Sequence, residues 1–120
     1  MQAASSRLSD ILVIRPAGRI DHLNAAELGQ LLAPHIDACR SGGDKLVIDL
    51  GQIDYISSAG LRVFLLAAKR INEAQGRMIL CSLKDSVKQV FDIAGFSSFL
   101  NLAGSIEEAI KSCPPLRPTY

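Results

Sequence analysis

Two adjacent serines, Ser57 and Ser58, stand between a strand-and-loop pattern and a helical pattern that begins at about Ala59. The first backbone N–H groups of a helix have no partner within the helix, and the helix dipole adds partial positive charge there. A serine at this position can therefore cap the helix. It is also well placed to carry a phosphate group.

Serine-based hydrolysis is the first enzymatic alternative for this pair. The G-x-S-x-G elbow of serine hydrolases also places its serine between strand and helix, but here Ile56 and Ser57 precede Ser58, so the first glycine is missing. The base would have to be His22 or His35, and a single histidine in a helical stripe is more often a packed core residue. The glycine-rich motifs of nucleotide-binding enzymes do not occur in the sequence. We therefore predict no enzymatic activity, no catalytic residue and no cofactor.

Composition and charge indicate a single globular domain. The chain has 120 residues, of which 48% are hydrophobic and 21% are charged, as is usual for a protein that folds alone. Its 13 basic and 12 acidic residues give a formal net charge of +1, so the basic excess that a nucleic-acid backbone usually requires is missing. We expect a stable monomer that does not bind nucleic acid.

Cysteine spacing and hydropathy favour a reduced, cytoplasmic protein. Cys39, Cys81 and Cys113 are widely spaced and form no C-x-x-C pair, which predicts free thiols and no metal site. The N-terminus has no apolar signal core, and no apolar run approaches the roughly 18 residues of a membrane span. We therefore expect a cytoplasmic protein without a membrane partner.

Hydrophobic periodicity predicts alternating strands and helices. Two helix starts are marked by the spacing of a capping box, one at Asn24 and Glu27 and the other at Ser105 and Glu108. The predicted strands cover residues 5–9, 11–14, 45–50, 77–81 and 99–102, and the predicted helices cover residues 24–39, 59–74, 87–94 and 105–112.

The order of these elements defines the expected fold. Strand 11–14 is expected to be buried on both faces and to end at Pro16 and Gly18, with strand 5–9 paired beside it. Pro34 is expected to kink the first helix. Strand and helix alternate afterwards, which predicts an α/β fold with a mixed, mainly parallel sheet of about five strands and four helices. We expect one domain over residues 1–112 and a disordered tail at 113–120.

The helix at 59–74 has a wider apolar band than one core-facing stripe requires. Either the helix is nearly buried or part of it meets a partner. The apolar positions are Leu61, Phe64, Leu65, Ala68 and Ile71, with Val63, Leu66 and Ala67 beside them.

Four segments of the chain resemble a known protein family. The resemblance covers about Leu8 to Ala109, and the strands and helices follow in the same order as in that family. Together they resemble the anti-sigma-factor antagonist family, the small bacterial STAS domains, and the resemblance implies a STAS-like fold. The segments are Gly18–Asp21, Leu46–Leu50, Tyr55–Leu61 and Phe91–Phe96.

The resemblance implies a switch without catalytic activity. In this family the unphosphorylated protein binds an anti-sigma factor that is also a serine/threonine kinase, and a sigma factor is released. Phosphorylation of a serine breaks that complex, and a PP2C-type phosphatase restores it. By motif position the acceptor is the serine two residues before the glycine, which here is Ser58 before Gly60.

The sequence departs from the family pattern next to the acceptor. The family usually has Asp before the acceptor and Ser or Thr after it, whereas this chain has Ser57 and Ala59. Ser57 is therefore a competing acceptor, and plain helix capping would explain both serines without signalling. Asp21 matches the family's acidic residue near the acceptor, and its structural alternative is a loop residue that caps the next helix.

Partner binding is expected at the segment that begins the second helix, although complete burial of that helix is the alternative. A rival function is a constitutive STAS interaction module in a stressosome-like assembly, or beside a transporter or a type III secretion regulator, without a sigma factor. The expected partner-binding residues are Asp21, Ser57, Ser58, Ala59, Gly60, Leu61 and Arg62.

Overall fold

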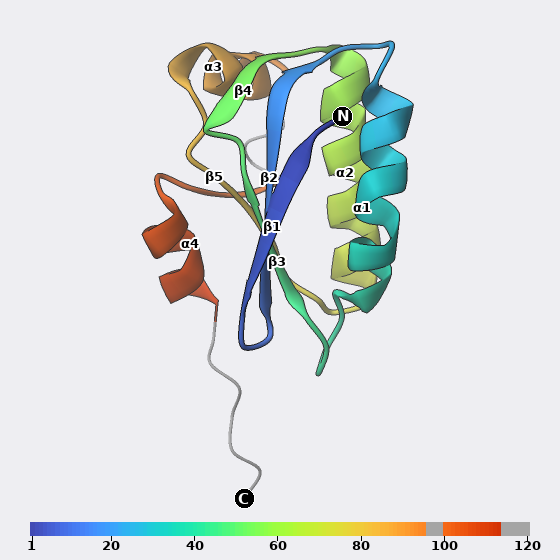
Figure 1. Ribbon diagram of the computed structural model, residues 1–120, viewed down its shortest axis with the longest axis vertical. Helices are drawn as coiled ribbons and strands as arrows, with labels where there is room; N and C mark the ends of the chain where they lie inside the picture. The colour runs from blue at the N-terminus through green and yellow to red at the C-terminus, as the bar shows by residue number, and fades with distance from the viewer. Residues whose placement is uncertain (96–99, 114–120) are drawn as a thin grey trace, which may run out of the picture.

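The computed structural model describes residues 1–95 and 100–113. Within them the chain forms one sheet of six strands and four helices (Figure 1). The strands are β1 (Ala3–Leu8), β2 (Ile11–Ile20), β3 (Lys45–Asp49), β4 (Gln52–Ile56), β5 (Met78–Cys81) and β6 (Asn101–Ala103), and the helices are α1 (Ala25–Ala38), α2 (Ser58–Glu73), α3 (Asp85–Ile93) and α4 (Ile106–Ser112).

The sheet has the order β1-β2-β3-β5-β6, and β4 pairs with β2 off this path. Only the pair β1–β2 is antiparallel, and the other strand pairs are parallel. The predicted mixed, mainly parallel α/β fold with a paired N-terminal edge strand is therefore confirmed.

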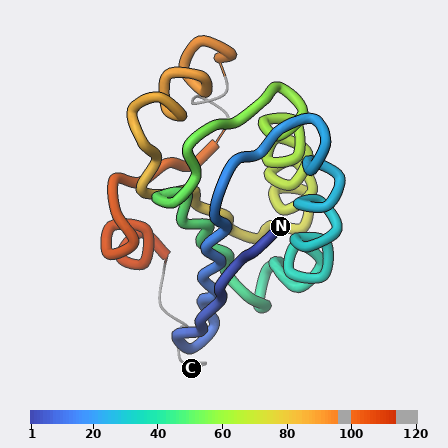
Figure 2. Tube along the Cα trace, turned by 45° about the horizontal axis from the view of Figure 1, so that its top comes forward, coloured from blue at the N-terminus to red at the C-terminus, as the bar shows by residue number. Residues whose placement is uncertain are grey.

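Helices cover both faces of the sheet, because successive side chains of a strand point to opposite sides. Leu12 and Ile14 of β2 face the large core under α1 and α2, whereas Ile11 and Val13 face the smaller cluster under α4. Figure 2 shows α1 and α2 side by side, with α4 on the opposite side of the strands and α3 near β4. The second helix thus packs beside α1 on the same face of the sheet.

Strand β2 is longer than predicted, since it runs through Pro16 and Gly18 to Ile20. Pro16 falls between the part of β2 that pairs with β3 and the part that pairs with β4, so its missing N–H interrupts neither parallel ladder. Gly18 has a φ of 102°, and the register with β4 shifts between Gly18 and Arg19. Glycine tolerates this backbone, and the strand continues as a bulge instead of ending.

Strand β4 is a sixth strand, in addition to the five segments predicted as strands. Its segment reads as a connection to the serines, but it pairs with β2 from Ala17 to Ile20. β3 runs beside the first half of β2 and β4 beside the second half. The extra strand carries the chain directly to Ser57.

The two predicted capping boxes have different outcomes. At α4 the hydroxyl of Ser105 accepts a hydrogen bond from the Glu108 N–H at 3.1 Å, while the Glu108 carboxylate accepts one from Gly104 N–H at 2.9 Å. At α1 the Asn24 side chain makes no cap bond. Its Oδ1 accepts from the Asp21 N–H at 2.8 Å, because the preceding loop folds back onto it. Helix α1 continues through Pro34 without interruption.

The predicted tail begins at Cys113, whose side chain is only 6% exposed in the cluster under α4. Residues 114–120 lie outside the described residues, as do Phe96 and Phe99 of the predicted segments.

Cys39, Cys81 and Cys113 are free and buried, and burial raises the pKa of each thiol. In the described part of the chain, no helix is long and apolar enough to cross a bilayer.

Candidate functional site

Ser57 is the N-cap of α2, because its side chain accepts a hydrogen bond from the Gly60 N–H at 3.2 Å. Its own N–H donates to the Ile20 carbonyl at 2.8 Å, which ties the helix start to the end of β2. Ser57 is half-buried. Its hydroxyl therefore satisfies one of the free N–H groups at the start of the helix.

Ser58 is the first residue of α2 and is exposed. Across the residues that the structure describes, its hydroxyl has no hydrogen-bond partner, since the capping bond is made by Ser57. It borders a groove of about 530 Å³ with a mainly apolar lining. The residues that line this groove are Ser58, Ala59, Arg62, Leu65 and Leu66.

Gly60 allows α2 to start directly on the ends of two strands. A Cβ at this position would lie 2.5 Å from Ile20 Cγ2 and 2.9 Å from Ile56 Cγ1. Both isoleucines are at most 2% exposed, so neither has free space to move into. The glycine therefore sets how closely the serine pair approaches the sheet.

We expect Gly60→Ala to lower the free energy of unfolding by about 1–2 kcal/mol, because crowding of buried isoleucines outweighs the better helix propensity of alanine. The matched control is Gly29→Ala in α1, where a new Cβ has no neighbour within 4 Å apart from the adjacent residues and backbone of its own helix. That substitution should raise the free energy of unfolding by up to about 1 kcal/mol. Urea unfolding measures both, and shifts of the same sign would contradict the close packing at Gly60.

Asp21 organises the loop between β2 and α1. Its Oδ1 accepts hydrogen bonds from the N–H groups of Leu23 at 3.0 Å and Asn24 at 3.1 Å. Its Oδ2 lies 3.5 Å from Arg19 Nε. The Asp21 carboxylate thus orders the loop before α1 and does not cap the first turn of the helix itself, and Asp21 lies next to Ile20, which is in close contact with Gly60.

The structure separates the expected partner-binding residues into exposed and buried ones. Ser58 and Arg62 are exposed, and Asp21, Ser57 and Ala59 are partly exposed. Gly60 is buried, and Leu61 is only 3% exposed, so its side chain belongs to the core of the free protein. Gly60 and Leu61 can therefore affect partner binding only indirectly, by positioning the exposed residues of the surface.

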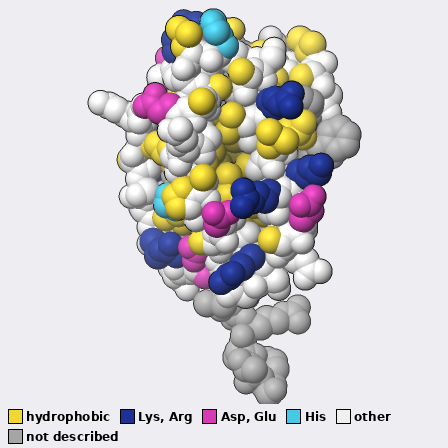
Figure 3. Space-filling model, turned by 90° about the vertical axis from the view of Figure 1, so that its right-hand side faces the viewer, with side chains coloured by type: hydrophobic (Ala, Val, Ile, Leu, Met, Phe, Trp, Pro, Cys, Tyr) yellow, Lys and Arg dark blue, Asp and Glu magenta, His cyan; other side chains and the backbone are white. Residues whose placement is uncertain are grey.

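The wide apolar band of α2 is partly buried and partly exposed. Phe64, Ala67, Ala68 and Ile71 are in the core, while Leu66 is 53% exposed beside the groove. On the side of the molecule that carries α1 and α2, hydrophobic side chains are visible between charged ones (Figure 3). The helix is therefore not nearly buried, and part of its apolar surface is open to a partner.

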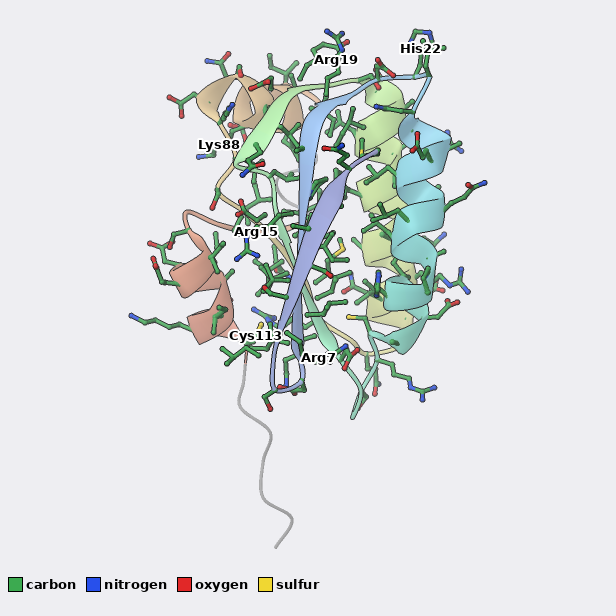
Figure 4. All side chains as sticks on the ribbon, in the orientation of Figure 1. Arg7, Arg15, Arg19, His22, Lys88 and Cys113 are labelled. Carbon is green, nitrogen blue, oxygen red and sulfur yellow. The ribbon has the colours of Figure 1, made fainter. Side chains whose placement is uncertain are left out.

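Sequence reasoning missed a group of side chains next to the serine pair. The guanidinium of Arg19 lies over the ring of Tyr55 at 4.7 Å from its centroid, and Asp54 forms an ion pair with Lys84. Figure 4 shows Arg19 and His22 at the end of the molecule where α2 begins. The sequence gives only a weak signal for this group, because Arg19 and Tyr55 come together only through the unexpected pairing of β2 with β4.

Comparison with known proteins agrees with this geometry. A family model described as the STAS domain matches residues 2–109. BtrV of Bordetella bronchiseptica, whose name describes it as a candidate anti-sigma factor antagonist, is 41% identical over 109 residues, which is 91% of each chain. The chain therefore belongs to the STAS domain family.

Two solved structures show the same fold at low sequence identity. A candidate anti-sigma factor antagonist from Thermotoga maritima has a TM-score of 0.81 at 19% identity, with 91% of this chain and 92% of the other covered. The anti-sigma factor antagonist SpoIIAA in its unphosphorylated form has a TM-score of 0.71 at 21% identity, with 92% and 94% covered. SpoIIAA of Bacillus has also been solved in its phosphorylated form.

Proposed function

We propose that this STAS domain is an anti-sigma factor antagonist that acts as a phosphorylation-controlled partner switch. The unphosphorylated chain binds an anti-sigma factor that is also a serine/threonine kinase, and the sigma factor is released. The name of BtrV supports the class, and the two forms of SpoIIAA support control by phosphate on this fold. In this proposal the protein acts as a cytoplasmic monomer without catalytic activity of its own.

The unbonded, exposed hydroxyl of Ser58 beside an apolar groove is the observation that carries this proposal. The kinase transfers the γ-phosphoryl group of ATP to Ser58 Oγ, the hydroxyl proton passes to a base of the kinase, and ADP leaves. A PP2C-type phosphatase then hydrolyses the ester with water, which restores the hydroxyl and releases inorganic phosphate. Ser57 is less suited, since its oxygen is already bonded to the Gly60 N–H.

Single substitutions of the two serines test the acceptor. Under the cognate kinase and radiolabelled ATP, Ser58→Ala should abolish phosphate incorporation, because Ser58 has the only exposed hydroxyl among the described residues that line the groove. Ser57→Ala should still be phosphorylated but lose about 1 kcal/mol of stability with the helix cap. Incorporation that survives Ser58→Ala and disappears with Ser57→Ala would assign the phosphate to Ser57.

The rival function, a constitutive interaction module without a sigma factor, gives a different result in a binding experiment. Capture with the unphosphorylated chain, followed by identification of the bound protein, should recover an ATP-binding serine kinase if the switch is correct. Recovery of a transporter or a secretion regulator, with no effect of phosphate on binding, would support the rival.

A further inference from the structure

Ser58 and Arg62 lie one helical turn apart on the exposed face of α2, and both line the same groove. Residues four apart on a helix have their Cβ atoms about 5–6 Å from each other. Long side chains of a helix lean toward its N-terminus, so Arg62 leans toward the turn that carries Ser58. The cation is therefore next to the proposed phosphate position.

Arg62 is also available for a new partner. Among the described residues the ion pairs of α2 involve Arg70, which bonds to Asp37 at 2.9 Å, and Arg62 takes part in none. Of the described residues that line the groove, only Arg62 is charged, as the others are a serine, an alanine and two leucines. An anion on Ser58 would find this guanidinium and no carboxylate among the groove's lining residues.

We propose that Arg62 binds the phosphate of phosphorylated Ser58 within the same helix. The anion stands N-terminal to the cation, which is the favourable order for a pair four residues apart. Phosphate and guanidinium also match in geometry, because two N–H groups can donate to two phosphate oxygens.

This inference rests on the proposed function and adds a second element to the switch. Phosphorylation would not only place negative charge in the groove but also withdraw Arg62 from the partner. The paired groups would then lie beside Leu65 and Leu66, which line the same groove. One modification would thus change the charge, the hydration and the shape of the same surface.

The test is the second pKa of phosphoserine at position 58, which is about 6 for an ordinary phosphoserine. Phosphoserine is introduced at residue 58 by genetic encoding, and the full chain is titrated by ³¹P NMR. A nearby cation favours the dianion and lowers this pKa, so Arg62→Gln should raise it by about 0.15–0.35 pH unit.

The matched control is Lys69→Gln, which removes an exposed cation from the same helix but not from the groove. It should move the phosphate pKa by less than about 0.1 pH unit, because the charge is distant and screened. Arg19, Asp21 and His22 of the neighbouring loop are the same in all variants, so their fields cancel in the comparison. Circular dichroism checks that each variant remains folded.

A shift for Arg62→Gln no larger than that for Lys69→Gln would overturn the pair. This outcome differs from failure of the proposed function, because the encoded phosphoserine does not require any kinase to recognise Ser58. A wrong acceptor would show in the phosphorylation of the alanine variants, whereas a missing phosphate–arginine pair would show only in this titration.

Discussion

Ser58→Asp is expected to weaken the complex with the cognate kinase by about 30- to 1000-fold and to leave the fold intact. A partner that covers the groove must remove water from the new carboxylate, next to the apolar side chains of Leu65 and Leu66. Desolvating this charge, which also draws the neighbouring Arg62 away from the partner, costs about 2–4 kcal/mol in an interface, and this corresponds to that loss of affinity. Isothermal titration calorimetry with the purified kinase measures it.

The fold should tolerate this substitution, since a carboxylate in the first turn of a helix interacts favourably with its dipole, by about 0.3–1 kcal/mol. Ser86→Asp is the matched control, because Ser86 is exposed in the first turn of α3 and does not line the groove. It should leave kinase affinity unchanged. Equal affinity for wild type and Ser58→Asp would remove Ser58 from the interface.

Phe64→Ala is expected to have the largest effect on stability, a loss of about 3–5 kcal/mol in the free energy of unfolding. Phe64 is fully buried, and its ring centroid lies 6.4 Å from that of Phe91 in α3. Removal of the ring leaves a cavity and breaks the contact between the two helices. Such a loss is a large fraction of the 5–15 kcal/mol that typically stabilises a domain.

Leu66→Ala is the control for this prediction, because Leu66 is on the same helix but 53% exposed. Its free energy of unfolding should change by no more than about 0.5 kcal/mol. In the proposed interface, however, Leu66→Ala should weaken kinase binding. Urea unfolding separates the two substitutions, and equal destabilisation by both would contradict the described division of α2 into buried and exposed sides.

The layer fold could be predicted from the sequence, because each element has a local signal. Strand β3 has the apolar run Leu46–Ile48 at its centre, and the box at Ser105 and Glu108 starts α4 as expected. The path of β2 could not be predicted in this way. Pro16 and Gly18 usually end a strand. Pro16 is tolerated here because β2 changes partner from β3 to β4 around it, and Gly18 because the pairing with β4 continues through a bulge. That exchange is a non-local event with no local signature.

At the candidate site, the position of the two serines could be predicted from the sequence, but not which of them caps the helix and which has a free hydroxyl. Ser57 and Ser58 are the same residue type, so only the backbone direction at the start of α2 decides which hydroxyl caps the helix. Likewise Leu61 belongs to an apolar band that is too wide for one stripe, and periodicity alone does not tell which of its members faces outward. The structure places Leu61 inside and Leu66 outside.

Because its three cysteines are buried, the protein should give little background reaction in thiol labelling. Cys39, Cys81 and Cys113 are shielded, and their raised pKa values keep them protonated at neutral pH, so a maleimide dye reacts with them slowly. Lys111 is exposed on α4, which covers the face of the sheet opposite to α2, so a cysteine introduced there is remote from the groove. A fluorophore there can follow partner exchange in real time without removal of any native thiol.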